Sequence, residues 1–282
     1  MPLGCQYGVG SPGFGVWREM AANTMATELA IDGDLECFAA MYHWRVMDGP
    51  MSDGPLFEEL ADIDGFVAYW HGSAGVRRRV EAITAAPAHV ALFLEYIPTR
   101  VPQWLTEQVA KGDASTSAAV DLVEECFVRD IPAMNAAGLF HFDAHFGNML
   151  TDGNQIYLAD FGLATSPTFE LSGPERDFLE RNASHDTAHT ITRLVDWLVT
   201  EFVDPPSREA RDAFIHEVAA TGDVAVSMNA SARRVIERYA PIAAVINAFY
   251  ARLHGEDKTA PYPTDAVLKA FDSSALEAPR VN

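Results

Sequence analysis

Three polar residues near the middle of the chain have the types and spacing that ATP-dependent phosphoryl transfer requires. Asp143 and Asn148 lie in the segment HFDAHFGN (residues 141–148), and Asp160 opens the triplet Asp-Phe-Gly (residues 160–162). An aspartate can orient an acceptor hydroxyl and take its proton, whereas amide and carboxylate oxygens are hard ligands for Mg²⁺. The sequence therefore predicts Asp143 as the catalytic base, and Asn148 and Asp160 as ligands of Mg²⁺ bound with ATP.

The segment between these two motifs predicts a β-hairpin. Short apolar runs flank the turn-forming residues Asp152-Gly153-Asn154. A hairpin returns the chain to its starting point, so it can bring Asn148 and Asp160 to one magnesium–triphosphate group.

Together, the two motifs resemble the catalytic loop and the Asp-Phe-Gly motif of the protein-kinase-like superfamily. His145 with the following Gly147-Asn148 is similar to aminoglycoside and choline kinases, whereas the intact Asp-Phe-Gly is typical of protein kinases. Ala91–Pro98 is similar to the strand that runs into the kinase hinge. Three further segments resemble a group of actinobacterial serine/threonine-kinase-like proteins: Tyr7–Gly10, Trp17–Glu19 and Tyr42–Val46.

The resemblance implies an ATP- and Mg²⁺-dependent phosphotransferase that acts on a hydroxyl group, either of a small molecule or of a protein Ser/Thr. It implies that the hinge residues Glu95, Tyr96 and Ile97 offer backbone groups to adenine, and that Asp186 anchors the catalytic loop from below. His145 could touch phosphate or acceptor, or could pack beside the loop. The supporting residues that the resemblance implies are His141, His145, Phe161, Gly162 and Glu19.

The pattern of elements predicts an α+β, two-lobed kinase-like fold with a reduced N-lobe (residues 1–98) and a helical C-lobe (residues 99–282). Residues 1–16 predict an irregular lead-in, and a loop is expected over residues 48–55. Strands are expected over residues 35–47 and, buried, over residues 89–96. Helices are expected over residues 17–33, 56–70, 76–85, 103–111, 117–138 (bent or broken at Pro132), 185–202, 207–221, 232–254 and 264–271, with one more that begins at a capping box of Ser172 and Glu175.

The lysine that kinases use to hold the α- and β-phosphates has no counterpart before the hinge. The first lysine of the chain is Lys111. Glu19 matches the helix glutamate that pairs with this lysine in the family, and Glu28 is a second choice that falls on the predicted apolar stripe. Arg18 or Arg45 could substitute, although a guanidinium is a bulkier, forked donor. We expect the chain to begin after the first N-lobe strands, which leaves a nucleotide-binding pseudokinase or a truncated, inactive kinase as alternatives.

Residues 8–16 (GVGSPGFGV) match the pattern G-x-G-x-x-G-x-V of a phosphate-covering loop. Such a loop joins two strands, and the helical pattern that begins at Trp17 leaves no room for them. The sequence therefore favours an irregular lead-in over a phosphate loop.

Composition restricts the partners. A formal net charge of −20 argues against nucleic acid or an anionic membrane as partner, and it is compatible with a cationic acceptor or simply with solubility. The scattered Cys5, Cys37 and Cys126 indicate no disulfide framework and favour the cytoplasm. No apolar run approaches the length of a membrane span.

Three remaining features complete the expectations. The short link between Gly162 and Ser172 lacks Ala-Pro-Glu, which favours a small-molecule acceptor over a peptide. His185 and His189 stand one helical turn apart, but no third ligand is evident, so they predict a capped helix at the solvent edge rather than a metal site. Residues 77–79, three consecutive arginines, predict a solvated helix face rather than a phosphate-binding patch.

Overall fold

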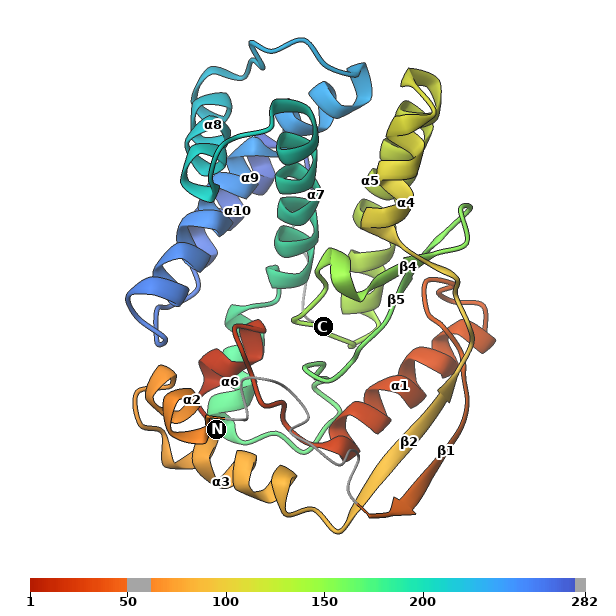
Figure 1. The fold of residues 1–282 in the computed structure, drawn as a ribbon, viewed down its shortest axis with the longest axis vertical. Helices are drawn as coiled ribbons and strands as arrows, with labels where there is room; N and C mark the ends of the chain where they lie inside the picture. Colours follow the sequence, from red (N-terminus) through yellow and green to blue (C-terminus); the bar gives the residue numbers. More distant parts are fainter. Residues whose placement is uncertain (50–61, 277–282) are drawn as a thin grey trace.

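The computed structural model of the protein describes residues 1–49 and 62–276 and shows an α+β fold with two small antiparallel sheets (Figure 1). The elements up to the end of the first sheet are the 3₁₀ helix η1 (Leu3–Tyr7), α1 (Val16–Ile31), β1 (Met41–Asp48), α2 (Ile63–Tyr69), α3 (Ala74–Thr84) and β2 (Ala88–Leu94). The elements that follow are β3 (Thr99–Arg100), α4 (Val101–Ala110), α5 (Asp113–Ala136), η3 (Phe146–Asn148), β4 (Met149–Thr151), β5 (Ile156–Leu158), α6 (Gly173–Arg181), α7 (His185–Val203), α8 (Arg208–Thr221), α9 (Ala230–Gly255) and α10 (Thr264–Ser273).

In the sequence, the strands of the first sheet precede residue 98 and those of the second sheet follow it. Strands β1 and β2 form an antiparallel pair, and β3, β4 and β5 form the second sheet in that order. The predicted hairpin is confirmed, because β4 and β5 pair in register from Met149 opposite Leu158 to Thr151 opposite Ile156. The turn is closed by the side chain of Asp152, whose Oδ1 accepts hydrogen bonds from the N–H groups of Asn154 and Gln155.

A helical core supports the second sheet. Helix α7 packs against α5, α8 and α9, and its first eight residues are all buried. The expectation that His185 and His189 lie at a solvent edge is therefore wrong, because α9 and the N-terminal segment cover this end of α7; the two side chains are 1% and 6% exposed. Helix α5 continues through Pro132, so the helix is not broken there.

The first sheet is less buried than predicted. All residues of β2 are half-buried or exposed, because β2 pairs with a single described strand and the sheet is too small to form a buried layer. Tyr42 and Phe93 are 72% and 46% exposed. Helix α1 turns a different face to the core than expected: the buried residues are Ala22, Asn23, Ala26 and Thr27, and Glu28 is exposed.

The N-terminal segment (residues 1–15) contains no strand but is part of the packed structure. Cys5, Gln6 and Tyr7 are buried, and the Tyr7 hydroxyl donates a hydrogen bond of 2.7 Å to Asn182 Oδ1. Figure 1 shows this segment between α6 and the lower end of α7. The irregular lead-in is thus confirmed in its backbone, apart from η1, but it packs firmly against the core.

Two expectations fall partly outside the described residues: the loop over residues 48–55 and the first half of the helix over residues 56–70. The second half of that helix is α2. Among the helices of residues 1–49 and 62–276, none combines the length and apolar character needed to cross a bilayer.

Candidate functional site

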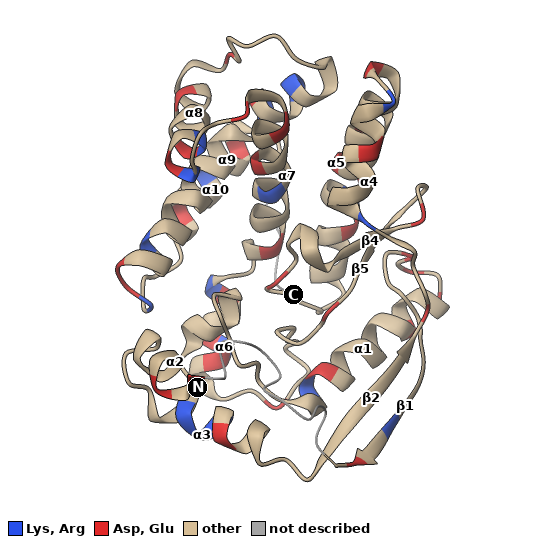
Figure 2. Ribbon diagram, in the orientation of Figure 1, with Lys and Arg blue, Asp and Glu red and all other residues tan. Residues whose placement is uncertain are grey.

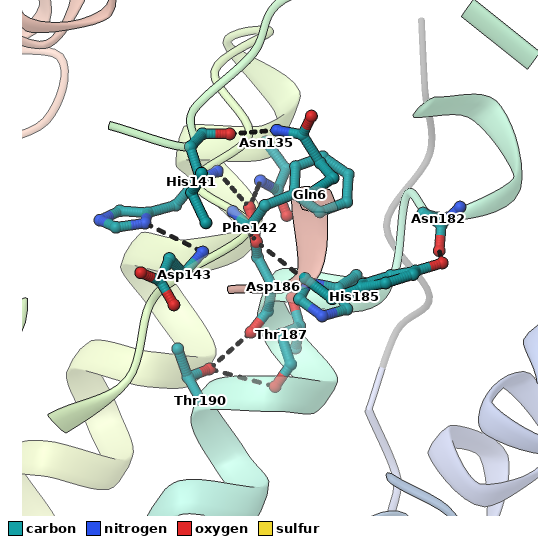
Figure 3. A network of polar contacts seen from close by, with 12 residues as sticks. Gln6, Asn135, His141, Phe142, Asp143, Asn182, His185, Asp186, Thr187 and Thr190 are labelled. Carbon is teal, nitrogen blue, oxygen red and sulfur yellow. Dashed lines mark hydrogen bonds and ion pairs between the residues drawn. The ribbon is translucent and has the colours of Figure 1, made fainter. Parts of the chain in front are cut away.

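The polar motif at residues 141–148 forms a loop between α5 and β4 that is fixed from below by Asp186, at the start of α7 (Figure 3). Asp186 Oδ2 accepts hydrogen bonds from the N–H of His141 (2.7 Å) and from Asn135 Nδ2 (2.8 Å), and Oδ1 accepts one from the N–H of Phe142 (2.7 Å). Phe142 donates this hydrogen bond with a φ of +61°. This is a left-handed backbone conformation that bulky side chains rarely adopt. Asp186 therefore holds the loop in the expected position.

The charge of Asp186 is sustained by these donors. Burial by itself would raise the pKa of the carboxyl group, but hydrogen bonds and the neighbouring His185 and His141 outweigh burial and lower the pKa. The side chain is only 2% exposed, and hydrogen bonds to both of its oxygens offset the cost of burying its charge.

His141 supports the loop by hydrogen bonding, as expected. Its side chain is completely buried, Nε2 lies 3.0 Å from the carbonyl oxygen of Ala159, and Nδ1 lies 3.3 Å from the N–H of Asp143. Since the N–H of Asp143 can only donate, Nδ1 is the acceptor and Nε2 carries the proton. The ring packs against Phe161, which is also buried, with 4.9 Å between ring centroids.

Asp143 is the partly buried carboxylate of the loop, with 22% of its side chain exposed. Asn148 Nδ2 donates to the carbonyl oxygen of Asp143 at 3.0 Å and to its Oδ2 at 3.3 Å. Burial raises the pKa of Asp143 to about 6, and the negative charge of Asp160 adds to this shift, whereas His141, His185 and the Asn148 hydrogen bond oppose it. Ala159 ties the next motif to this loop, because its N–H donates to the carbonyl oxygen of Asn148 at 2.9 Å and its carbonyl oxygen lies 3.0 Å from His141 Nε2. Asp160, the next residue, therefore starts beside the loop that carries Asp143.

Asp160 is exposed and stands beside Glu19 of α1. The backbone of Asp160 is left-handed (φ +63°), a conformation that aspartate tolerates, and its Oδ1 accepts a hydrogen bond from the N–H of Gly162 at 3.2 Å. A Cβ on Gly162 would lie 3.1 Å from Asp160 Oδ1 and 3.9 Å from Glu19 Oε2. Burial raises the pKa of Glu19, and the charge of Asp160 raises it further.

His145 lies at the open side of the loop. Its Nδ1 accepts a hydrogen bond from the N–H of Gly147 at 2.9 Å, which caps η3, and its Nε2 is 3.9 Å from Asp143 Oδ1. Burial lowers its pKa. His145 thus packs beside the loop and also faces the space next to Asp143.

The backbone groups of the predicted hinge residues 95–97 differ in whether they already form hydrogen bonds. The N–H of Glu95 already donates to the carbonyl oxygen of Ala40 at 2.7 Å. The carbonyl of Glu95 and the N–H of Ile97 form no backbone hydrogen bond with another described residue, so they stay available to a ligand. The side chain of Tyr96 is 84% exposed, and that of Ile97 is buried.

The cation whose charge acts on Glu19 is Arg79, which was predicted to lie on a solvated helix face with residues 77 and 78; that prediction is wrong for the half-buried Arg79. Arg18 instead forms an ion pair with Glu175 (2.8 Å), and the guanidinium of Arg45 lies over the ring of Phe93. Arg79 of α3 is half-buried, its Nε donates to the carbonyl oxygen of Pro12 at 3.3 Å, and its charge lowers the pKa of Glu19. The sequence itself indicated that Arg79 is partly buried, since it follows Val76 by three residues and therefore lies on the buried face of α3.

The glycine-rich segment lies against the catalytic loop, although it joins no strands. Gly8 is so close to Asp143 that a Cβ would lie 2.3 Å from Asp143 Oδ1, and its φ of +72° also favours glycine. A Cβ on Gly13 would lie 3.7 Å from the carbonyl oxygen of Gly162. Trp70 Nε1 donates to the carbonyl oxygen of Gly10 at 3.0 Å. The segment thus runs from Asp143 to the Asp-Phe-Gly triplet.

The donor set would suit a metal ion that takes few protein ligands rather than one held by protein alone. Nowhere in residues 1–49 or 62–276 do three or more His, Cys, Asp or Glu side chains gather closely enough to hold a metal. However, Asn148 donates through its nitrogen and thereby keeps Oδ1 free, and the charge of Asp160 raises the pKa of both Asp143 and Glu19. This excess of negative charge would be relieved by Mg²⁺, which usually takes one or two protein ligands plus phosphate oxygens.

No protein-family model matches the chain, and a comparison with curated protein sequences likewise found no match.

Proposed function

We propose that the protein is an ATP- and Mg²⁺-dependent phosphotransferase of two-lobed, kinase-like architecture. The observation that carries the proposal is that hydrogen bonds link the two motifs: Asn148 Nδ2 donates to Asp143, and the N–H of Ala159, next to Asp160, donates to the carbonyl oxygen of Asn148 at 2.9 Å. Asp186 fixes the loop through the N–H groups of His141 and Phe142. Two carboxylates and an amide in this arrangement are what phosphoryl transfer requires, because the rate derives from positioning and charge neutralisation.

In this mechanism Asp143 is the base. The acceptor hydroxyl gives its proton to the Asp143 carboxylate while its oxygen forms a bond to the γ-phosphorus. The bond between that phosphorus and the β–γ bridging oxygen breaks, and ADP leaves. Asn148 Oδ1 and Asp160 would hold Mg²⁺, which supplies charge neutralisation for the phosphates. The adenine amino group would donate a hydrogen bond to the carbonyl oxygen of Glu95, and a ring nitrogen would accept one from the N–H of Ile97.

The direct test measures phosphate transfer or release from labelled ATP with Mg²⁺. Asp160→Ala removes a metal ligand from an exposed position, so we expect activity to fall at least about 100-fold while the unfolding transition is retained. Asp177→Ala is a suitable control, since it changes an exposed aspartate of α6 outside the candidate site. Equal rates for the unchanged protein and Asp160→Ala would overturn the proposal.

Arg79 takes the role of the missing lysine in this proposal. Hydrogen bonds between charged groups contribute about 1.5–3 kcal/mol, so Arg79→Ala should lower kcat/KM for ATP by roughly 10- to 100-fold. Arg79→Lys should restore much of the loss, whereas Arg78→Ala, at the exposed neighbouring position, should change little. If Arg78→Ala and Arg79→Ala behave alike in steady-state kinetics, Arg79 has no role in phosphate binding.

A second candidate function is a nucleotide-binding regulatory module without catalysis. The observation that favours it is that all three lysines, at positions 111, 258 and 269, follow the first sheet, so no ammonium can replace Arg79 near Glu19 from α1, β1, α2, α3 or β2. Thermal unfolding with ATP and Mg²⁺ separates the alternatives when combined with the transfer assay. A rise in Tm with no turnover would support the module, and a rise with turnover would support the enzyme.

A further inference from the structure

A cavity of about 200 Å³ opens beside Asp143. Its walls come from parts of the chain that are far apart in sequence: the N-terminal residues 7–9, the catalytic loop, and helices α7, α8 and α9. Neither Asn148 nor Asp160 lines the cavity. A molecule bound there would face the base without occupying the place of the nucleotide phosphates.

His189 provides a polar group in the cavity wall that has no partner. Its side chain is 6% exposed, and neither ring nitrogen forms a hydrogen bond with any described residue. The ring is held between His185 and Tyr250, with centroid distances of 5.3 and 5.1 Å. A buried imidazole without partners is costly, so a cavity ligand that bonds to it would gain that free energy.

The cavity is cationic in a protein of strongly negative charge. Arg193 and Arg208 line it, whereas Asp143 is its only acidic lining residue. This is unusual in a chain with a formal net charge of −20, whose basic residues are sparse over the ribbon (Figure 2). Burial lowers the pKa of His189 and of His254; Arg193 lowers that of His189 further, and Arg208 lowers that of His254 further.

Both arginines keep capacity for a ligand despite their own ion pairs. Arg193 pairs with Asp196 at 2.8 Å and donates to Asn247 through the same terminal nitrogen, but its buried Nε has no partner among the described residues. Arg208 is 43% exposed and reaches Asp212 only at 3.7 Å. Two such forks are suited to a carboxylate or a phosphate group.

We propose that this cavity binds the anionic group, a carboxylate or a phosphate, of a small hydroxylated acceptor and presents its hydroxyl to Asp143. The inference rests on the proposed function and names its substrate class: a hydroxy acid or a sugar or polyol phosphate. The small volume favours a small molecule over a folded peptide, and the two arginines in the lining disfavour an amine-bearing acceptor, which the net charge alone would have allowed. Transfer then follows the step given above, with ATP as the phosphoryl donor.

Anion binding can be tested without nucleotide, and therefore independently of catalysis. Inorganic phosphate and glycerate are titrated into the protein in the presence of EDTA, with the histidine ring signals followed by NMR and His189→Gln used for assignment. EDTA prevents phosphate from binding through Mg²⁺ at Asp160. We expect both anions to shift the His189 signal at millimolar concentration and to compete with one another, while choline and glycerol cause no shift.

Arg208→Gln supplies the quantitative test, since the side chain is partly exposed and its loss should not unfold the protein. We expect the affinity for phosphate to fall about tenfold or more, which corresponds to about 1.4 kcal/mol. Arg78→Gln removes the same charge from α3, at the opposite end of the molecule from α8 in Figure 1, and should leave binding unchanged. No His189 shift with either anion, or equal affinity in the unchanged protein and Arg208→Gln, would overturn the inference.

The transfer assay with an acceptor panel separates the two proposals. Faster transfer to glycerate or glycerol phosphate than to choline or ethanolamine supports both. Transfer to the amines but not to the acids retains the phosphotransferase and overturns the anionic acceptor. Anion binding without any transfer from ATP overturns the phosphotransferase, and with it the acceptor role of the cavity.

Discussion

Asp143→Asn should abolish most phosphate transfer and at the same time make the folded protein more stable. An asparagine cannot take a proton from the acceptor, and loss of a general base typically costs about 10²–10⁴-fold in rate. The side chain is nearly isosteric, so the loop should remain in place on Asp186. The rate is measured with labelled ATP, and the stability by urea unfolding of the same two proteins.

The gain in stability follows from the cost of burying the Asp143 charge. Burial raises the pKa of Asp143 from 3.8 to about 6. At neutral pH, ionising this carboxyl group therefore costs more free energy in the folded state than in the unfolded state. A shift of this size corresponds to about 2–3 kcal/mol. The group is neutral in both states below its unfolded pKa, so the cost is absent there and is fully present only above about pH 6. The advantage of Asp143→Asn should therefore be near maximal at pH 7.5 and fall to about half at pH 5.

A matched substitution separates this effect from a general response to lost charge. Asp177→Asn changes an exposed aspartate on α6 and should alter neither the rate nor the unfolding free energy by more than about 0.5 kcal/mol. A destabilised Asp143→Asn protein would show that the carboxylate is needed for the fold. A variant with unchanged rate would remove Asp143 as the base.

Asp186→Ala should give the largest loss of stability of any single change at the site. It would leave the N–H groups of His141 and Phe142 and the amide of Asn135 buried without their acceptor. Removing one partner from a buried, charged network costs about 3–5 kcal/mol. We expect a corresponding decrease in the free energy of unfolding and loss of phosphate transfer, since the loop that carries Asp143 would no longer be held.

Asp186→Asn serves to separate positioning from folding. It keeps one oxygen acceptor but turns an NH₂ group toward a donor, so it should fold with a smaller penalty and still show a reduced kcat with little change in KM for ATP. Asp177→Ala is the surface control. A cost below about 1 kcal/mol for Asp186→Ala in chemical denaturation would contradict the role of Asp186 as the anchor of the loop.

Features that depend on neighbouring residues could be predicted from the sequence. The hairpin around Asp152-Gly153-Asn154 formed as expected because the turn is closed by the side chain of Asp152 itself. The start of α6 was predicted from Ser172 and Glu175, and Glu175 Oε2 accepts hydrogen bonds from both the N–H and the hydroxyl of Ser172. The contacts within the loop over residues 141–148 could also be predicted from the sequence, since Asn148 contacts Asp143 only five residues away.

Features that depend on distant partners were decided only by the tertiary structure. The exposure of β2 and the burial of His185 and His189 depend on which layers cover them, and periodicity along one segment does not contain that information. The pairing of Arg18 with Glu175 left Arg79 as the cation beside Glu19. The cavity beside Asp143 depends on the same cause, because its two arginines come from α7 and α8, which meet only after folding. The sequence alone determined which polar side chains the loop over residues 141–148 carries and how they contact one another, whereas long-range packing determined what surrounds them.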